Sequence, residues 1–200
     1  MIGKIVDNPP KLILPEQEDI RVREAQEVLI KMGFNMADIN AFDDFNKYKD
    51  HIKNKKFATN WTDQMLEEYI RLPLVKSLLL LDMGYVDCLV AGANTATADV
   101  IKSSIRIVGL NDDTQWISSS FFLVNPENQK GYTYADCGVI PEPDSEQLAS
   151  IAYQASRIHK LISDEEPKVA FLFRDSTDHL TLIFLRKFVY ILLYIEMPNS

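Results

Sequence analysis

Short apolar runs alternate with longer amphipathic stretches along most of the chain. Runs of about five apolar residues predict buried strands, and apolar residues three or four positions apart predict helices. We expect strands at 11–15, 87–91, 116–124, 131–136 and 168–173. We expect helices at 19–32, 42–56, 60–70, 74–83, 97–108 and 145–161. This alternation predicts the α/β class, with a mostly parallel sheet and flanking helices.

Several residues mark where these helices begin and end. Gly33 and Gly84 follow apolar helical patterns and predict helix ends, and Pro73 interrupts the helical stretch that begins at residue 60. Asp144 and Gln147 have the spacing of a capping box at the start of the last helix. Thr95 or Thr97 would cap the helix at 97–108.

Composition and charge exclude several function classes. The formal net charge is −8, from 29 acidic and 21 basic residues, which argues against sequence-independent nucleic-acid binding because such binding needs a dense basic surface. The longest apolar stretch, 180–197, has 14 apolar residues in 18 but is broken by Arg186 and Lys187, so we expect no membrane span. No apolar run near the N-terminus suits a signal peptide, and the two cysteines match no zinc or redox spacing. We expect a cytoplasmic protein without a metal site.

Two loops that follow predicted strands are candidates for chemistry, because α/β proteins bind ligands at the carboxyl ends of parallel strands. The first is the small-residue loop GANTATAD, 92–99, whose backbone N–H groups either bind an anion or simply form a turn. Lys102 and Arg106 follow on one helix face and either add positive charge to that site or form a solvated edge.

The second loop is Tyr134–Gly138. Asp136 either handles a proton at a cleft or ties the loop, and the hydroxyl run 118–120 either contacts phosphate or forms a polar strand face. Cys137 would act as a nucleophile only with a depressed thiol pKa. His159 shares a helix segment with Arg157 and Lys160, which favours a solvent-facing position.

Five segments in this order resemble the phosphate acetyltransferase (phosphotransacetylase) and phosphate butyryltransferase family. They are LPEQEDIR (14–21), DCLVAGANTATADVIKSSIRIVG (87–109), SSSFFLV (118–124), YADCGVIPEPDSEQLASIA (134–152) and PKVAFL (167–172). The resemblance implies two α/β domains of the isocitrate/isopropylmalate dehydrogenase-like architecture, a cleft between them and a homodimer. It implies the reaction acetyl-CoA + phosphate ⇌ acetyl phosphate + CoA, with CoA as a substrate and no permanently bound cofactor or metal.

The resemblance covers about residues 11–172, and it implies a family-like α/β region at 1–172 with a domain boundary near 110–125. Beyond residue 172 the chain departs from the family, which continues into a Ser/Thr-Lys-Gly-Ser loop and a long segment that holds its base-like Asp and its Ser–Arg pair. No catalytic residue can therefore be assigned. We interpret 173–200 as a divergent apolar tail of a truncated or frame-shifted copy; the alternative is a genuine strand or helix that closes a shortened domain.

Two arginines of the family's cleft are also replaced, with Lys53 and Lys102 as the nearest equivalents, and lysine lacks the two-pronged grip of arginine. The residues expected to contact substrate are Asn94, Thr95, Thr97, Lys102, Asp136, Lys53 and Ser119. Because the catalytic segment is missing, we expect an acyltransferase with impaired turnover. The alternative is a non-catalytic module that binds CoA or phosphate, or a partner of an intact homologue.

Overall fold

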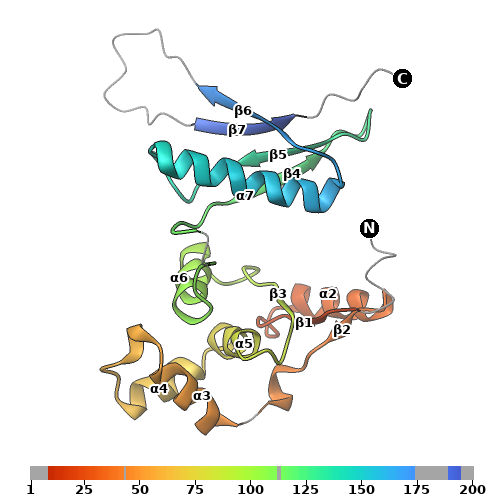
Figure 1. Cartoon of the computed structure of the whole chain (residues 1–200). Coiled ribbons are helices and arrows are strands. Elements are labelled where there is room, and N and C mark those ends of the chain that lie inside the picture. The colour runs from red at the N-terminus through yellow and green to blue at the C-terminus, as the bar shows by residue number, and fades with distance from the viewer. Residues whose placement is uncertain (1–8, 43, 112–113, 174–188, 195–200) are drawn as a thin grey trace, which may run out of the picture. The chain divides into compact units, whose positions relative to one another are not determined.

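The computed structural model of the chain describes residues 9–42, 44–111, 114–173 and 189–194 (Figure 1). The chain divides into two compact units, Met1–Gly109 and Leu110–Ser200. The division falls at the start of the interval in which the sequence places the domain boundary.

The first unit is built on a three-stranded parallel sheet in the order β2-β1-β3. β1 (Lys11–Ile13) lies between β2 (Asn35–Met36) and β3 (Cys88–Leu89). The pairing is parallel, so β1 and β3 end at the same edge of the sheet and the loops that follow them become neighbours. β2 was not predicted, because a two-residue strand is too short to show a periodicity.

The helices of the first unit agree with the predicted segments. They are α2 (Ile20–Lys31), α3 (Phe45–Lys53), α4 (Asp63–Ile70), α5 (Pro73–Asp82) and α6 (Thr97–Ile107), with short 3-10 turns at Ile39–Ala41 and Lys56–Ala58. The predicted interruption is confirmed, because Pro73 stands at the first turn of α5, where a missing N–H costs nothing.

Helix α5 is the centre of the first unit's core. Leu78, Leu79 and Leu80 are all 2% exposed or less, and they belong to one apolar cluster with Ile13 of β1 and Ile107 of α6. This cluster fixes α6 against α5 and so holds the polar residues at the start of α6 beside the junction of α4 and α5.

The second unit has a four-stranded sheet in the order β4-β5-β7-β6. Its strands are β4 (Ser120–Val124), β5 (Gly131–Ala135), β6 (Lys168–Phe173) and β7 (Val189–Tyr194), and every described pairing is antiparallel. The α/β class is confirmed, but the parallel sheet is confined to the first unit. A connection of only six residues, 125–130, joins β4 to β5, and so short a link permits only antiparallel pairing.

One long helix, α7 (Ser145–Ser163), lies along this sheet (Figure 1). The predicted capping box is confirmed: the backbone N–H of Gln147 donates to Asp144 Oδ1 at 2.9 Å, and the backbone N–H of Asp144 donates to Gln147 Oε1 at 3.0 Å. Ile151 and Ala155 of α7 form a buried cluster with Ala135 of β5. No helix in the described parts of the chain is both long and apolar enough to cross a membrane.

His159 of α7 does not face solvent as predicted; it is fully buried. Its Nδ1 lies 2.9 Å from Thr133 Oγ1 of β5, and its ring lies 5.6 Å from that of Phe122. The residues next to His159 in the sequence are charged. A helix that packs one face against a sheet nevertheless buries every third or fourth residue, whatever residues lie between them. The buried ring therefore ties α7 to β5.

Acidification should weaken the second unit through this histidine. Burial lowers the pKa of His159, and the nearby Glu165 only partly opposes that effect. The unfolded chain therefore binds the proton more readily than the folded one, and stability should fall as the pH drops below the ordinary histidine pKa of about 6.5. Thermal melts from pH 8 to pH 5 should show this loss, and His159→Phe should remove its pH dependence; an equal dependence in that variant would contradict the assignment.

The described part of the tail is paired. β7 lies between β5 and β6, with Leu193 opposite both Thr133 and Val169. This agrees with the alternative in which the tail closes a shortened domain, while its status as non-family sequence stays a prediction. The rest of the predicted tail, 174–188 and 195–200, lies outside the described residues.

Candidate functional site

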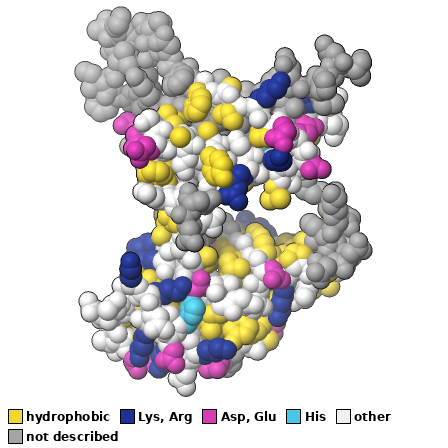
Figure 2. All heavy atoms as spheres, viewed as in Figure 1, with side chains coloured by type: hydrophobic (Ala, Val, Ile, Leu, Met, Phe, Trp, Pro, Cys, Tyr) yellow, Lys and Arg dark blue, Asp and Glu magenta, His cyan; other side chains and the backbone are white. Residues whose placement is uncertain are grey.

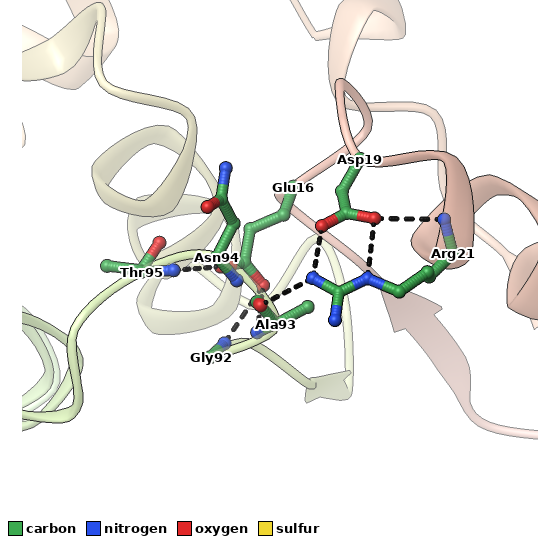
Figure 3. A network of polar contacts seen from close by, with 7 residues as sticks. All are labelled: Glu16, Asp19, Arg21, Gly92, Ala93, Asn94 and Thr95. Atoms are coloured by element: carbon green, nitrogen blue, oxygen red, sulfur yellow. Dashed lines mark hydrogen bonds and ion pairs between the residues drawn. The ribbon is translucent and has the colours of Figure 1, made fainter.

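The backbone N–H groups of the GANTATAD loop surround an internal carboxylate. Glu16 Oε2 accepts from the N–H groups of Gly92 and Ala93, both at 2.9 Å. Its Oε1 accepts from those of Asn94, at 2.8 Å, and Thr95, at 2.6 Å (Figure 3). We call these four donors the N–H cradle. The predicted anion-binding geometry is present, and the anion in it is a side chain of the same chain.

The cradle stabilises the ionised form of Glu16. Partial burial of the carboxyl raises its pKa, but hydrogen bonds from Asn94, Ala93 and Thr95 outweigh this effect and lower the pKa to about 2. A carboxylate that accepts several backbone N–H bonds is expected to stay ionised in this way. Glu16 is therefore charged at every physiological pH.

A second contact fixes the loop from its carbonyl side. Arg21 Nη2 donates to Ala93 O at 2.9 Å, and Asp19 in turn holds the same guanidinium, with Arg21 Nε 3.0 Å from Asp19 Oδ1 (Figure 3). The segment after β1 thus bonds four backbone N–H groups and one carbonyl oxygen of the loop after β3.

A pocket of about 550 Å³ lies beside this loop, within the first unit. One wall is apolar and comes from the α4–α5 junction, and the other is polar and comes from the loop and α6. The lining residues are Pro15, Glu16, Glu18, Asp19, Tyr69, Leu72, Pro73, Leu74, Val75, Asn94, Thr95, Asp99, Lys102, Ser103 and Arg106. A volume of this size and a mixed lining are typical of small-molecule sites.

The pocket is lined by two cations and by the four carboxylates of Glu16, Glu18, Asp19 and Asp99. Lys102 and Arg106 lie one turn apart on α6 and both line the pocket. Two of the carboxylates there already have partners, Glu16 in the cradle and Asp19 on Arg21. On the face drawn in Figure 2, acidic and basic side chains are interspersed.

In the second candidate loop, which lies in the second unit, the Asp136 carboxylate accepts hydrogen bonds from nearby residues of the same unit. Asp136 Oδ1 accepts from the N–H of Ser119 at 2.7 Å and from its hydroxyl at 2.6 Å. Asp136 Oδ2 accepts from the N–H groups of Val139, at 3.0 Å, and Ile140. This arrangement agrees with the interpretation of Asp136 as a residue that ties its loop.

The amino-acid sequence matches the family model described as phosphate acetyl/butaryl transferase over residues 4–179. The chain belongs to this family. The resemblance found in the five sequence segments is therefore confirmed.

Individual relatives of this phosphate acetyl/butaryl transferase family member point the same way. It is 31% identical to the phosphate acetyltransferase of Thermoanaerobacterium thermosaccharolyticum, over 86% of this chain and 61% of the relative. It is 28% identical to that of Acetivibrio thermocellus, over 80% of this chain and 57% of the relative. The chain thus spans about 60% of the length of these relatives.

Solved structures support the fold. A phosphotransacetylase from Streptococcus pyogenes superposes with a TM-score of 0.74 at 23% identity, over 83% of this chain and 58% of the other. A phosphotransacetylase from Staphylococcus aureus superposes with a TM-score of 0.67 at 21% identity, over 82% and 57%. The phosphotransacetylase-like architecture expected from the resemblance is confirmed at this partial coverage.

Three of the residues predicted to contact substrate meet in one pocket of this family member: Asn94, Thr95 and Lys102. Thr97, the first residue of α6, is exposed and does not line that pocket. Neither threonine caps α6 as predicted, because the N-cap position is taken by Ala96 without a side-chain hydrogen bond. The Glu16 carboxylate accepts from backbone N–H groups of the loop that precedes α6.

Lys53 is not brought to the pocket. Its Nζ lies 2.8 Å from Asp63 Oδ1 at the start of α4. Lys53 lines neither this pocket nor a second one of about 520 Å³ that shares Pro15 and Glu18 with it. Ser119 and Asp136 belong to the second unit and bond each other. Their predicted contacts with substrate stay predictions.

Cys137 is a poor candidate for a nucleophile. Burial and the neighbouring Asp136 raise the pKa of Cys137, against the requirement for a reactive thiolate. His51 Nε2 lies 2.5 Å from Asp82 Oδ2, which also accepts from Lys55. His179 lies outside the described residues. Within the described ranges, no cluster of three or more His, Cys, Asp or Glu side chains is arranged to hold a metal.

Sequence reasoning missed two contributors to the site. The sequence analysis gives Glu16 no role in a site. Its position directly after a predicted strand, with a small-residue loop after a neighbouring parallel strand, is nevertheless a usable signal. The apolar wall at Tyr69 and 72–75 gave no signal, because its residues read as helix and core positions.

Proposed function

We propose that this chain binds acetyl-CoA or CoA, together with phosphate, for the family's acyl transfer: acetyl-CoA + phosphate ⇌ acetyl phosphate + CoA. Support comes from the family model that matches 4–179 and from relatives named phosphate acetyltransferases. The chain spans about 60% of the length of those relatives. We therefore propose, for this chain, the acyl-transfer activity, its substrates and a homodimer.

The observation that carries the proposal is the pairing of Lys102 and Arg106 with an apolar wall in one pocket. CoA combines anionic phosphates with a long, weakly polar arm and an adenine ring. The two cations would hold the phosphates, while Tyr69 and Leu72 cover the less polar part and exclude water from it. Asn94 and Thr95 would add polar contacts at the loop.

The chemistry requires more than this pocket supplies. Transfer between a thiol and phosphate needs two anionic partners held together, a donor for the developing oxyanion and a group that handles the thiol proton. The first-unit pocket offers the anion grip, and we assign no base or oxyanion donor. We therefore propose that binding is retained and turnover is impaired, by about 10²–10³-fold or more where an oxyanion donor is lost.

Calorimetric titration with CoA tests the binding proposal. Lys102→Ala should weaken CoA binding about tenfold, because a charge-assisted hydrogen bond of about 1.5 kcal/mol is lost. Lys102→Arg should retain or tighten binding, since arginine keeps the charge and adds a bidentate grip.

The matched control is Lys31→Ala, at the exposed end of α2 outside the pocket, which should leave the affinity unchanged. Absence of heat with the wild-type chain at millimolar CoA, or equal affinities of wild type and Lys102→Ala, would contradict the proposal. Formation of acetyl-CoA from acetyl phosphate and CoA, followed on the same samples, separates the two functional alternatives. Binding without turnover supports the non-catalytic module, and turnover at the rate of an ordinary acyltransferase would contradict impairment.

A further inference from the structure

The N–H cradle has room for one oxyanion group, and that place is taken. Both oxygens of Glu16 accept two backbone N–H bonds each, all at 2.9 Å or less. Four successive donors before a helix would ordinarily attract a phosphate or carboxylate of a ligand. While Glu16 stays bound, a substrate phosphate cannot use them.

The contacts of Glu16 also cross a long distance in sequence. They join the segment after β1 to a loop 76 to 79 residues away, and Arg21 adds a bond from the same segment to Ala93 O. The loop includes Asn94 and Thr95, which line the pocket, and it leads directly into α6, which carries the two cations. Loss of this anchor would free the polar wall of the pocket.

We propose that Glu16 is a positioning residue for substrate binding: its carboxylate serves as the internal anion of the N–H cradle and holds the 92–95 loop in its binding geometry. The substrate's phosphate is then held by the side chains of Lys102 and Arg106, not by the backbone of the loop. The role of Glu16 in substrate binding rests on the proposed function. Its role as the internal anion of the N–H cradle is tested independently.

Three variants separate filling of the cradle from the mere presence of a side chain. Glu16→Ala empties the cradle and leaves space for a small carboxylate such as formate. Glu16→Gln fills the same space with an amide, whose NH₂ group faces N–H donors and cannot accept from them. Glu27→Ala, on the exposed surface of α2, is the control for loss of one negative charge.

Thermal unfolding with sodium formate against sodium chloride at equal ionic strength gives the first readout. Formate should raise the melting temperature of Glu16→Ala, and it should leave the wild type, Glu16→Gln and Glu27→Ala unchanged. Equal shifts in all four proteins, or none in Glu16→Ala, would overturn the internal-anion assignment. A general structural role of Glu16 predicts destabilisation without such selective rescue.

CoA affinity gives the second readout. Glu16→Ala should bind CoA about tenfold more weakly, the loss expected for one misplaced hydrogen bond, and formate should restore the affinity. If the wild type and Glu16→Ala bind CoA equally well, the positioning role is wrong. If the wild type itself fails to bind CoA while formate rescues Glu16→Ala, the proposed function and the positioning role both fail, and the internal anion stands.

Discussion

Replacing Asp136 with alanine should lower the free energy of unfolding of the second unit by about 2–4 kcal/mol, because donors that lose their only acceptor in a folded protein cost about 1–3 kcal/mol each. Asp136 is 9% exposed and accepts four hydrogen bonds, two from Ser119 and one each from Val139 and Ile140. Partial solvation of the freed donors keeps the loss below the full sum. Asparagine should cost nearly as much, since its amide turns two donors toward other donors.

Urea titration followed by the fluorescence of Trp116 measures this loss. The chain has two tryptophans, and Trp116 is the one in the second unit, so a Trp61→Phe background isolates its signal. Glu142→Ala, an exposed acid of the same unit, should change the stability little. An Asp136→Ala chain as stable as that control, but with weaker CoA binding, would favour a ligand role over the loop-tying role.

The same experiment has a defined pH dependence. Burial raises the pKa of Asp136, but hydrogen bonds from Ser119, Ile140 and Val139 outweigh it and lower the pKa. A carboxyl with a depressed pKa stabilises the fold above its unfolded pKa of about 4 and loses that effect as the pH falls further. The gap between wild type and Asp136→Ala should therefore be constant near neutral pH and should narrow below pH 4.

The second large effect is expected in the core of the first unit. Leu79→Ala should destabilise that unit by about 2–5 kcal/mol, the range for a buried leucine that leaves a cavity. Leu79 has no exposed surface and lies in the cluster that joins α5 to Ile13 and Ile107. Because this cluster also holds α6, partial unfolding of the first unit should abolish CoA binding at temperatures where the wild type still binds.

Trp61 fluorescence in a Trp116→Phe background follows the first unit alone. Ile30→Ala, which removes a side chain of similar size that is 53% exposed on α2, is the matched control and should cost less than about 1 kcal/mol. A loss at Leu79→Ala no greater than at Ile30→Ala would show that α5 is not the centre of the core.

The helices could be predicted because their signals are local. Gly33, Pro73 and the Asp144–Gln147 capping box each act within one or two turns of the chain, and the observed helix bounds follow them. The family could also be predicted from the sequence, because the match over 4–179 depends on the order of residues and not on their contacts.

Strand pairing was harder to predict from the sequence. The sequence predicts β4, β5 and β6 of the second unit but neither β7 nor the antiparallel order of the strands, because pairing depends on connections and on partners far along the chain. β7 is the plainest example: it belongs to the segment interpreted as a divergent apolar tail, and its residues 189–194 pair with both β5 and β6.

What the sequence by itself determined is the α/β class, the helices, the capping box of α7, the family, and the grouping of Asn94, Thr95 and Lys102 around one loop. What only the tertiary structure decided is which groups face one another: Glu16 in the N–H cradle, Lys53 on Asp63 and His159 inside the second unit. The reason is physical. Periodicity and capping act over a few residues, whereas a carboxylate finds its donors across 76 or more residues only once the parallel strands β1 and β3 have paired.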